Sequence, residues 1–205
     1  KELQEKVFFT LRKMGMGGIY DQLRGGFARY SVDGEWFAPH FEKMGYDNGQ
    51  LLELFAKASQ VSHEPLFLEK VTETVAWIQT EMLQEDGDFH SAQDEDSQGV
   101  EGKFYTWTYA ELAKILPDDM PWFSKLYNLK PSGNWEDGVN ILFQTKPYEE
   151  IATAFKMSEL DFTAKLNEVK AKLIEIRNKR IFPGKDDKIL SGWNGILSAG
   201  LIQAY

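Results

Sequence analysis

The stretch Ser158-Glu-Leu-Asp-Phe-Thr-Ala-Lys-Leu-Asn-Glu-Val-Lys-Ala-Lys-Leu-Ile-Glu-Ile176 indicates most clearly how this chain folds. Its apolar residues recur at i, i+4, i+7, i+11 and i+14, a spacing that places them on one face of a helix. They are Phe162, Leu166, Val169, Leu173 and Ile176. Ser158 has the character of an N-cap, and Asp161 complements the helix dipole in the first turn. We therefore predict an amphipathic helix that opens at Ser158 and is closed by Pro183-Gly184.

The same periodicity recurs along the chain. It predicts helices over about 3–14, 47–61, 66–83, 109–116 and 120–127, and a last one from about 190 onward. Thr108 and Glu111 have the spacing of a capping box at the start of one of them. The stretch 131–145 is interpreted as a loop with a brief strand. The chain is therefore predicted to be all-α, with six to eight helices in antiparallel pairs, small β-hairpins in the loops and no parallel sheet.

Two glycine- and aromatic-rich loops resemble each other. Gly-Gly-Phe-Ala at 25–28 and Gly-Asp-Phe-His at 87–90 each follow a helix and lead through a hairpin to another helix. Asp33-Gly34 suits a tight turn in the first hairpin. The echo suggests a repeat of helical hairpins with long loops on one face. An irregular helical bundle is the alternative that the echo leaves open.

Composition excludes several classes of function. A net charge of −9 argues against nucleic-acid or anionic-membrane partners, which require a basic face. No apolar run approaches the roughly 20 residues that cross a bilayer. The chain has no cysteine, which removes disulfides, thiolate metal sites and cysteine nucleophiles. We expect no cofactor, no metal, no nucleic-acid partner and no membrane partner.

The densest group of chemically active side chains lies in residues 36–48, at a junction between loop and helix. Its candidate site residues are Trp36, His40, Glu42, Tyr46, Asp47 and Asn48. If the helix begins near Phe41, Glu42 and Tyr46 share one of its faces. The alternative is structural: Lys43 and Asp47 form an exposed i,i+4 ion pair, and His40 is a packing residue.

A second group is the acidic run Asp94-Glu-Asp96. In an extended chain the backbones of Asp94 and Asp96 lie ~6.6 Å apart and their side chains point the same way. Two carboxyls on one strand cannot flank a scissile bond, so one of them is expected to pair with a carboxylate from another loop. The run also opens like an EF-hand, but the twelfth position is Tyr105, where a glutamate is required. An acidic hairpin tip in water is the structural alternative.

Two further groups place a tryptophan beside amides and carboxylates. One is Gly133-Asn-Trp135-Glu136, and the other runs from Asp186 through Asp187, Trp193 and Asn194 to Gly195. Sugars favour this mixture, because their C–H faces stack on aromatic rings while polar side chains hold their hydroxyls. Trp193 also lies at helical spacing with Leu190, Leu197 and Leu201, which is typical of a core residue.

Several motifs, taken in order, resemble the spermatogenesis-associated thioredoxin-domain family. They are Gly-Gly-Ile-Tyr-Asp at 17–21, Gly-Gly-Phe-Ala-Arg-Tyr-Ser at 25–31, Pro-His-Phe-Glu-Lys-Met at 39–44, Tyr-Asp-Asn at 46–48, Ser-Ala-Gln-Asp-Glu-Asp-Ser at 91–97, Glu-Gly-Lys-Phe-Tyr at 101–105, Gly-Asn-Trp-Glu at 133–136, and Asp-Asp-Lys-Ile-Leu with Trp-Asn-Gly at 186–195. The sequence departs from the family pattern at Ala28, where the family has histidine, and at Gly45, where it has a larger apolar residue. Ala28 removes a possible acid/base group.

The resemblance implies a partial (α/α)6 toroid over 1–205, of the six-hairpin glycosidase-like kind, truncated at both ends. An N-terminal thioredoxin-like domain would lie outside it. The toroid is similar to those of glycosidases and N-acylglucosamine 2-epimerases, so the expected role is carbohydrate processing or binding, and the expected location is cytoplasmic. A non-catalytic interaction domain serving the thioredoxin-like module is the alternative. Fold alone does not decide between them.

In a ring of helical hairpins, alternate connections emerge on the same face, so polar loop residues are expected to converge there. The expected catalytic residues are Asp94, Asp96, Asp47, Asp187 and His40, and the expected substrate-binding residues are Trp36, Glu42, Tyr46, Asn48, Trp135, Trp193 and Asn194. The more buried of Asp94 and Asp96 is assigned as acid, because burial raises a carboxyl pKa. Asp47 or Asp187 is the base, and His40 orients. A last helix with its apolar stripe left open predicts self-association.

Overall fold

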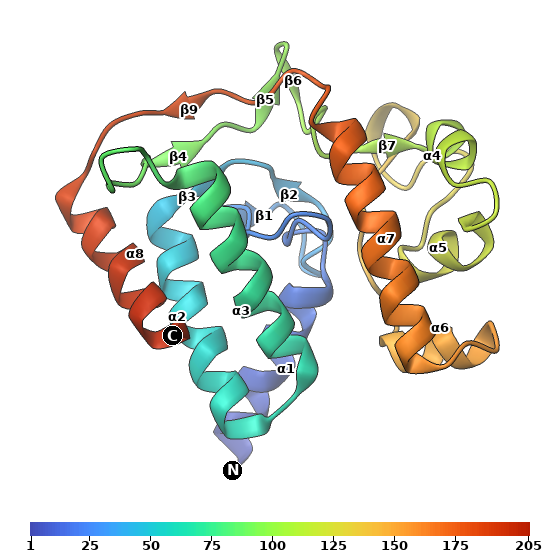
Figure 1. Cartoon of the computed structure of the whole chain (residues 1–205), viewed down its shortest axis with the longest axis horizontal. Coiled ribbons are helices and arrows are strands. Elements are labelled where there is room, and N and C mark those ends of the chain that lie inside the picture. The colour runs from blue at the N-terminus through green and yellow to red at the C-terminus, as the bar shows by residue number, and fades with distance from the viewer.

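The computed structural model describes residues 1–205 as helices joined by long loops that carry short hairpins (Figure 1). The helices are α1 (Glu2–Met16), α2 (Gly45–Ser62), α3 (Pro65–Trp77), α4 (Tyr109–Ile115), α5 (Met120–Leu126), α6 (Tyr148–Ala154), α7 (Glu159–Arg177) and α8 (Ser191–Ala204). A π-helical turn, η1 (Ile78–Met82), continues α3, and η2 (Glu136–Gly138) is a 3-10 turn. None of these helices combines the length and the apolar character that a membrane span requires.

All the strands are two residues long and pair antiparallel. They are β1 (Tyr30–Ser31), β2 (Pro39–His40), β3 (Lys43–Met44), β4 (Ala92–Gln93), β5 (Asp96–Ser97), β6 (Val100–Glu101), β7 (Trp107–Thr108), β8 (Val139–Asn140) and β9 (Lys185–Asp186). The prediction of a mostly helical chain with small hairpins and no parallel sheet is confirmed.

Two predicted helix starts are confirmed at the level of single hydrogen bonds. The Thr108 hydroxyl accepts the N–H of Glu111 at the start of α4, and the Ser158 hydroxyl accepts the N–H of Asp161 at the start of α7. Helix α6 was not predicted. It has no side-chain cap like that of the equally short α4, and the signal available was Pro147 directly before it.

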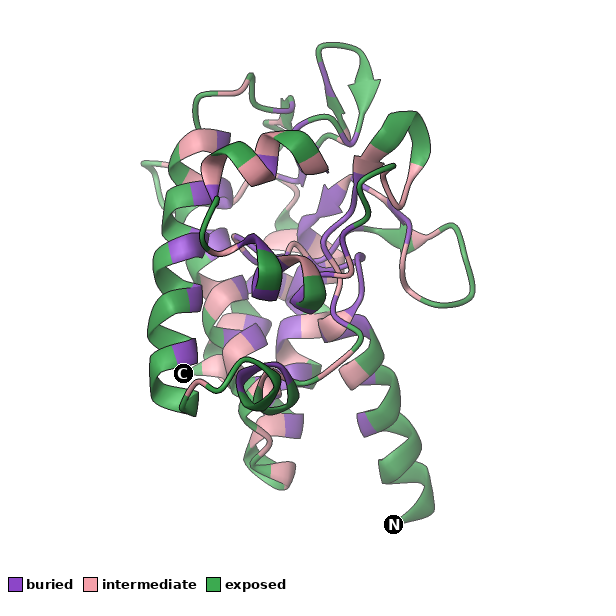
Figure 2. Ribbon diagram, turned by 90° about the vertical axis from the view of Figure 1, so that its right-hand side faces the viewer, coloured by how far each residue is buried: buried purple, intermediate pink, exposed green.

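The helices form two bodies with separate apolar cores. The first body contains α1, α2, α3 and α8, and its core includes Phe27, Phe55 and Trp77. The second body contains α4 to α7, and its core includes Trp107 and Phe123. Figure 1 shows the first body on the left and the second on the right. In Figure 2 the buried residues lie on helix faces turned towards one another, whereas the first turns of α1 project into solvent.

A polar seam joins the two bodies. Arg177, at the end of α7, donates two hydrogen bonds of 2.9 Å to Asp21, which lies in the loop after α1. Lys170 of α7 donates to Glu73 of α3 over 2.7 Å. Buried ion pairs contribute little net stability, but breaking one leaves an uncompensated charge. The seam therefore fixes how the bodies fit together more than it adds to stability.

Within the first body, α2 and α8 pack closely side by side. A Cβ atom on Gly200 would lie 2.4 Å from the carbonyl oxygen of Gly49, so the two backbones are nearly in contact. Leu197 is fully buried in this contact, whereas Ile202 on the outer side of α8 is 77% exposed. Self-association through α8 stays a prediction.

Two predicted details of the first loop are wrong. The segment around Asp33-Gly34 is not a tight turn, because β1 and β2 are separated by residues 32–38. The Asp33 carboxylate organises this wider loop by accepting the N–H groups of Glu35, Phe37 and Ala38. Helix α2 begins at Gly45, close to the predicted start near Asp47, and the alternative start near Phe41 is wrong because residues 43–44 pair with β4 as a strand.

Candidate functional site

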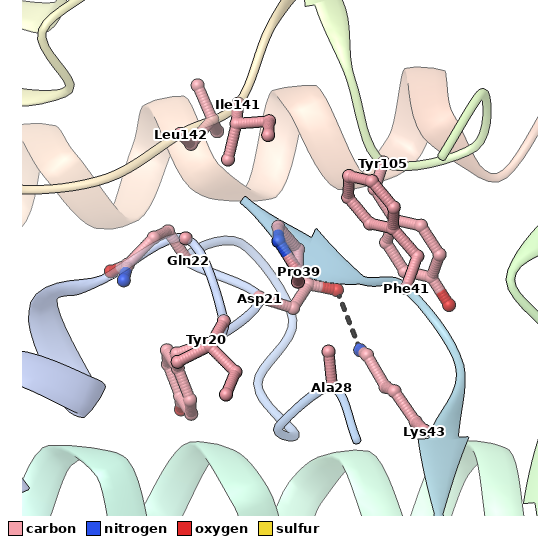
Figure 3. Close-up of a pocket in the computed structure, with 12 residues that line it drawn as sticks. Tyr20, Asp21, Gln22, Ala28, Pro39, Phe41, Lys43, Tyr105, Ile141 and Leu142 are labelled. Carbon is pink, nitrogen blue, oxygen red and sulfur yellow. Dashed lines mark hydrogen bonds and ion pairs between the residues drawn. The ribbon is translucent and has the colours of Figure 1, made fainter. Parts of the chain in front are cut away.

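Residues 39–44 form an extended segment with two different faces. Side chains alternate along such a segment. Pro39, Phe41 and Lys43 point into a cavity inside the protein (Figure 3). His40 and Glu42 point to the opposite side, where they meet other loops. We call the two sides the inner cavity and the outer face. The outer face comprises Arg29, Tyr30, His40, Glu42, Tyr46, Asp47, Glu95, Glu101 and Trp193.

His40 lies between two carboxylates on the outer face. Its Nε2 is 4.0 Å from Glu95 Oε1, and its Nδ1 is 3.9 Å from Glu101 Oε1. Its ring also packs edge-on against Tyr30, with 4.9 Å between centroids. These distances are longer than hydrogen bonds, and Nδ1 is buried without a partner. The imidazole is therefore held between its neighbours, with no hydrogen bond at its buried Nδ1.

Asp47 stands in the first turn of α2, beside the ion pair that Arg29 forms with Glu42 over 3.1 Å. Its Oδ2 atom is buried and has no hydrogen-bond partner. Burial raises the pKa of Asp47 to about 6, although Arg29 opposes the shift. A carboxyl with this pKa carries its proton over part of the neutral range, as a general acid must.

Glu95 is a second carboxyl whose pKa is raised by burial. Burial raises the pKa of Glu95 above its ordinary value, and its neighbour Asp94 adds to the shift. Glu95 comes from the loop between β4 and β5, whereas Asp47 comes from α2. The outer face therefore carries two carboxyls of raised pKa from different elements, and Glu95 is the one that borders His40.

Aromatic rings from two helix starts complete the outer face. Tyr46 of α2 and Trp193 of α8 meet edge to face, with 4.6 Å between their centroids. The three-stranded sheet β3-β4-β9 brings these helix starts together, because β3 runs directly into α2 and β9 lies shortly before α8. Of the predicted site residues, the structure thus brings together His40, Glu42, Tyr46, Asp47 and Trp193.

The acidic run lies beside this face in a different way from that predicted. Asp94 and Asp96 are both exposed, so neither has the buried surroundings that the acid role requires. The chain bends at residues 94–95 before the β5–β6 hairpin, and a strict alternation does not apply there. Glu95, between the two, is the carboxyl that approaches His40. Asp187 is exposed in the loop before α8 and forms no ion pair.

Four predicted substrate-binding residues make their contacts inside the fold. Asn48 and Asn194 hydrogen-bond the backbone of Phe27 and Phe89, respectively. Trp36 packs against the first core, and Trp135 packs on Phe41 with 5.3 Å between centroids. These residues are not part of the outer face.

Sequence reasoning missed Arg29, Tyr30, Glu95 and Glu101. Each lies within a motif that was recognised, but none was assigned a role there. For Glu95 no signal existed, because the bend at residues 94–95 breaks the alternation of an extended run. The same alternation in residues 39–44 separates His40 and Glu42 from Lys43.

The structural alternative proposed for Lys43 is wrong. Lys43 was expected to pair with Asp47 in water, but its side chain is 3% exposed and points into the inner cavity. Its Nζ donates to Asp21 Oδ2 over 3.0 Å (Figure 3). It also donates to the Gly25 carbonyl over 2.8 Å. Burial lowers the pKa of Lys43 to about 8, with Asp21 opposing the shift and Arg177 adding to it.

Asp21 is shared between Lys43 and Arg177. Burial alone would raise the pKa of Asp21, but these two cations hold it well below its ordinary value. Tyr105 stacks on Phe41 beside them, 5.4 Å between centroids, and its hydroxyl is buried without a partner. Ala28 also lines the cavity, which offers about 30 Å³ of space to water-sized ligands.

No family model matches the sequence. Comparison with curated proteins finds relatives over nearly the whole chain. Spermatogenesis-associated protein 20 of Homo sapiens is 32% identical over 222 residues, which cover 96% of this chain and 28% of that protein. The protein of the same name from Rattus norvegicus is 31% identical, covering 98% and 29%. An uncharacterized protein of Caenorhabditis elegans is 31% identical, covering 96% and 30%.

The chain therefore spans about three-tenths of the length of the curated relatives it matches. Proteins named spermatogenesis-associated protein 20 are homologous to it over this part.

Proposed function

We propose that this chain is part of a glycosidase-like or epimerase-like α/α toroid and that its outer face binds carbohydrate. The observation that carries the proposal is a group of acidic side chains on this face: Glu95 and Glu101 lie 4.0 and 3.9 Å from the His40 ring, and burial raises the pKa of Glu95 and of Asp47 at the start of α2. A carboxyl that keeps its proton near neutrality can protonate a glycosidic oxygen, and a second carboxyl nearby can act as base or nucleophile.

The surroundings of these carboxyls suit a sugar. Tyr46 and Trp193 offer aromatic surface for the C–H face of a pyranose ring, and Arg29, Glu42 and His40 offer donors and acceptors for its hydroxyls. We assign proton donation to Asp47, the opposing carboxyl to Glu95, and orientation of the ligand to His40.

The arrangement of the first body supports the toroid. A long loop joins α1 to α2, η1 at the end of α3 leads through another long loop to α8, and α2 packs against both α3 and α8. Both loops return to helix starts at the same three-stranded sheet. Loops that gather at one end of paired helices are what a ring of helical hairpins requires.

A second candidate is a non-catalytic interaction domain that serves an attached thioredoxin-like module. The observation favouring it is that His40, Asp47 and Glu95 line none of the five best-formed cavities of the molecule. A flat face suits a protein partner better than a small sugar.

A binding screen against glycans and sugar phosphates separates the two. The chain is compared with Asp47→Asn and Glu95→Gln, and with Asp118→Asn as a matched control in which an exposed carboxyl on the second body is neutralised. The proposal predicts a saccharide whose affinity falls at least tenfold in the first two variants and is unchanged in the control. If no saccharide binds at millimolar concentration, or if all three variants behave alike, the interaction domain takes its place.

A further inference from the structure

The ionic group at the inner cavity, formed by the lining residues Asp21 and Lys43 and by Arg177 behind Asp21, holds more positive than negative charge. Lys43 and Arg177 are 3% and 1% exposed in their side chains, and both pair with a single carboxylate, Asp21. The group carries a net charge of +1 in a chain whose total is −9. An uncompensated buried charge is costly, so a site of this kind favours a ligand that supplies the missing negative charge.

Glu81, the other carboxylate that interacts with Lys43, does not supply the missing negative charge. Glu81, in η1, attracts Lys43 electrostatically, but its carboxylate already forms ion pairs with Arg24 and Lys185. That group also has two cations for one carboxylate. The excess of positive charge therefore extends from the inner cavity towards β9.

Hydrogen-bond donors remain unused around the same cavity. An ammonium group has three N–H donors, and Lys43 uses two of them, on Asp21 and Gly25. The Nε–H of Arg177 and the hydroxyl of Tyr105 are both buried without partners. Tyr105 and Lys43 line the cavity (Figure 3), and Arg177 lies against the Tyr105 ring, 5.7 Å from its centroid.

We propose that the inner cavity binds a small carboxylate, such as formate or the carboxylate end of a slightly larger acid. The space of about 30 Å³ admits one small polar group and excludes a bulky one. A carboxylate has two oxygens that accept several hydrogen bonds, so it matches the set of free donors and neutralises the excess charge. The site is independent of the outer face, because residues 39–44 separate the two.

Titration with formate tests the proposal, with chloride at equal ionic strength as the reference for screening. The melting temperature and the heat of binding are measured for the full chain. Formate is expected to raise the melting temperature more than chloride does. Its affinity should fall as pH rises through about 8, where Lys43 loses its proton in the field of Asp21, Arg177 and Glu81.

Two variants locate the site. Lys43→Met should lower formate affinity at least tenfold. Tyr105→Phe removes a hydroxyl that bonds nothing in this structure, so the variant should fold with unchanged stability and bind formate several-fold more weakly. Equal effects of formate and chloride, unchanged affinity in Tyr105→Phe, or an affinity independent of pH between 7 and 9 would each overturn the assignment. An unfolded Lys43→Met variant leaves the decision to Tyr105→Phe.

Discussion

The chain contains two helix–loop–helix units, one from α1 to α2 and one from α3 to α8. The same contacts hold the loop of each unit to its second helix, although the loop of the second unit contains the whole second body. Each loop begins with a single antiparallel bridge to a phenylalanine, Tyr20 to Phe27 in one and Leu83 to Phe89 in the other. An asparagine in the first turn of the following helix then binds that phenylalanine. The echo between 25–28 and 87–90 is therefore a repeat in three dimensions.

The two asparagines form corresponding hydrogen bonds. Asn48 accepts the N–H of Phe27 over 2.7 Å and donates to its carbonyl over 2.9 Å. Asn194 accepts the N–H of Phe89 over 2.9 Å and donates to its carbonyl over 3.1 Å. Each also donates to the carbonyl four residues earlier in the chain. The amide is required because it offers a donor and an acceptor side by side.

The units differ in burial and in the residue before the asparagine. Asn48 is completely buried, whereas Asn194 is partly exposed. The preceding residue is Asp47 in the first unit and Trp193 in the second, and both belong to the outer face. The asparagine therefore maintains the fold in both units, whereas the residue before it differs in chemistry between them.

The largest effect is expected for Asn48→Ala. The substitution removes three hydrogen bonds and leaves the N–H and C=O of Phe27 buried without partners. Unsatisfied buried groups cost about 1–3 kcal/mol each, so the free energy of unfolding should fall by about 3–5 kcal/mol. Urea denaturation measures it, and a loss below about 1 kcal/mol would show that Asn48 is not structural.

The next largest loss of stability is expected at the contact between α2 and α8. In Gly200→Ala the added Cβ meets the backbone oxygen of Gly49 at 2.4 Å, so α2 and α8 must move apart. We expect a loss of about 2 kcal/mol. Gly195→Ala is the matched control, because no atom lies within 4 Å of its Cβ in the same helix. That control should gain up to about 1 kcal/mol from helix propensity. Equal losses in both variants, measured by thermal unfolding, would argue against close packing.

Asn194→Ala should cost less than Asn48→Ala. Water can reach the partly exposed Phe89 backbone and replace part of the lost bonding, so about 1 kcal/mol is expected. Hydrogen exchange at the Phe89 amide should accelerate at the same time. A loss as large as that of Asn48→Ala would mean that the second loop depends on its asparagine just as strongly, despite the difference in burial.

The smallest effect concerns Asp47. Its pKa in the folded protein is about 6, above the unfolded value of 3.8, so it contributes stability below pH 4 that is lost as pH rises through 6. Asp47→Asn cannot ionise and should become more stable relative to the original chain as pH rises from 4 to 7. Because the group is partly solvated, we expect less than about 1 kcal/mol. The ¹³C chemical shift of the Asp47 carboxyl, followed by NMR, should titrate with a midpoint near pH 6. A midpoint near pH 4 would contradict this.

Much of the helical framework could be predicted from the sequence, because its long helices bury regular apolar stripes. The helix opened by Ser158 and the one that continues from α3 through η1 follow their patterns closely. Helix α6 could not be found in this way, because it has no side-chain cap of the kind that marks the equally short α4. The start of α2 was predicted within two residues, but the strand before it was not, because the pairing of Lys43 and Met44 with Gln93 and Ala92 depends on a partner about fifty residues away.

The candidate site was predicted in outline only. His40, Glu42, Tyr46 and Asp47 are neighbours in the sequence, so their motif identified them together. Glu95 and Glu101 reach His40 through the bend before the β5–β6 hairpin, which local patterns do not specify. Asn48 and Asn194 were assigned to a ligand because an amide beside an aromatic ring suits a sugar. The same amide equally suits a backbone strand, and the tertiary contacts decide in favour of the backbone.

The most direct test of the outer face is a titration of the isotopically labelled chain with the best saccharide from the screen, followed by ¹H–¹⁵N NMR. The account predicts that the Trp193 indole, the His40 ring and the amides at the start of α2 shift together, with one saturation curve. The Trp135 indole, which packs inside the fold, should not shift. Signals that move only in the seam between the two bodies, or no signal moving at all, would contradict the assignment of the outer face as a carbohydrate site.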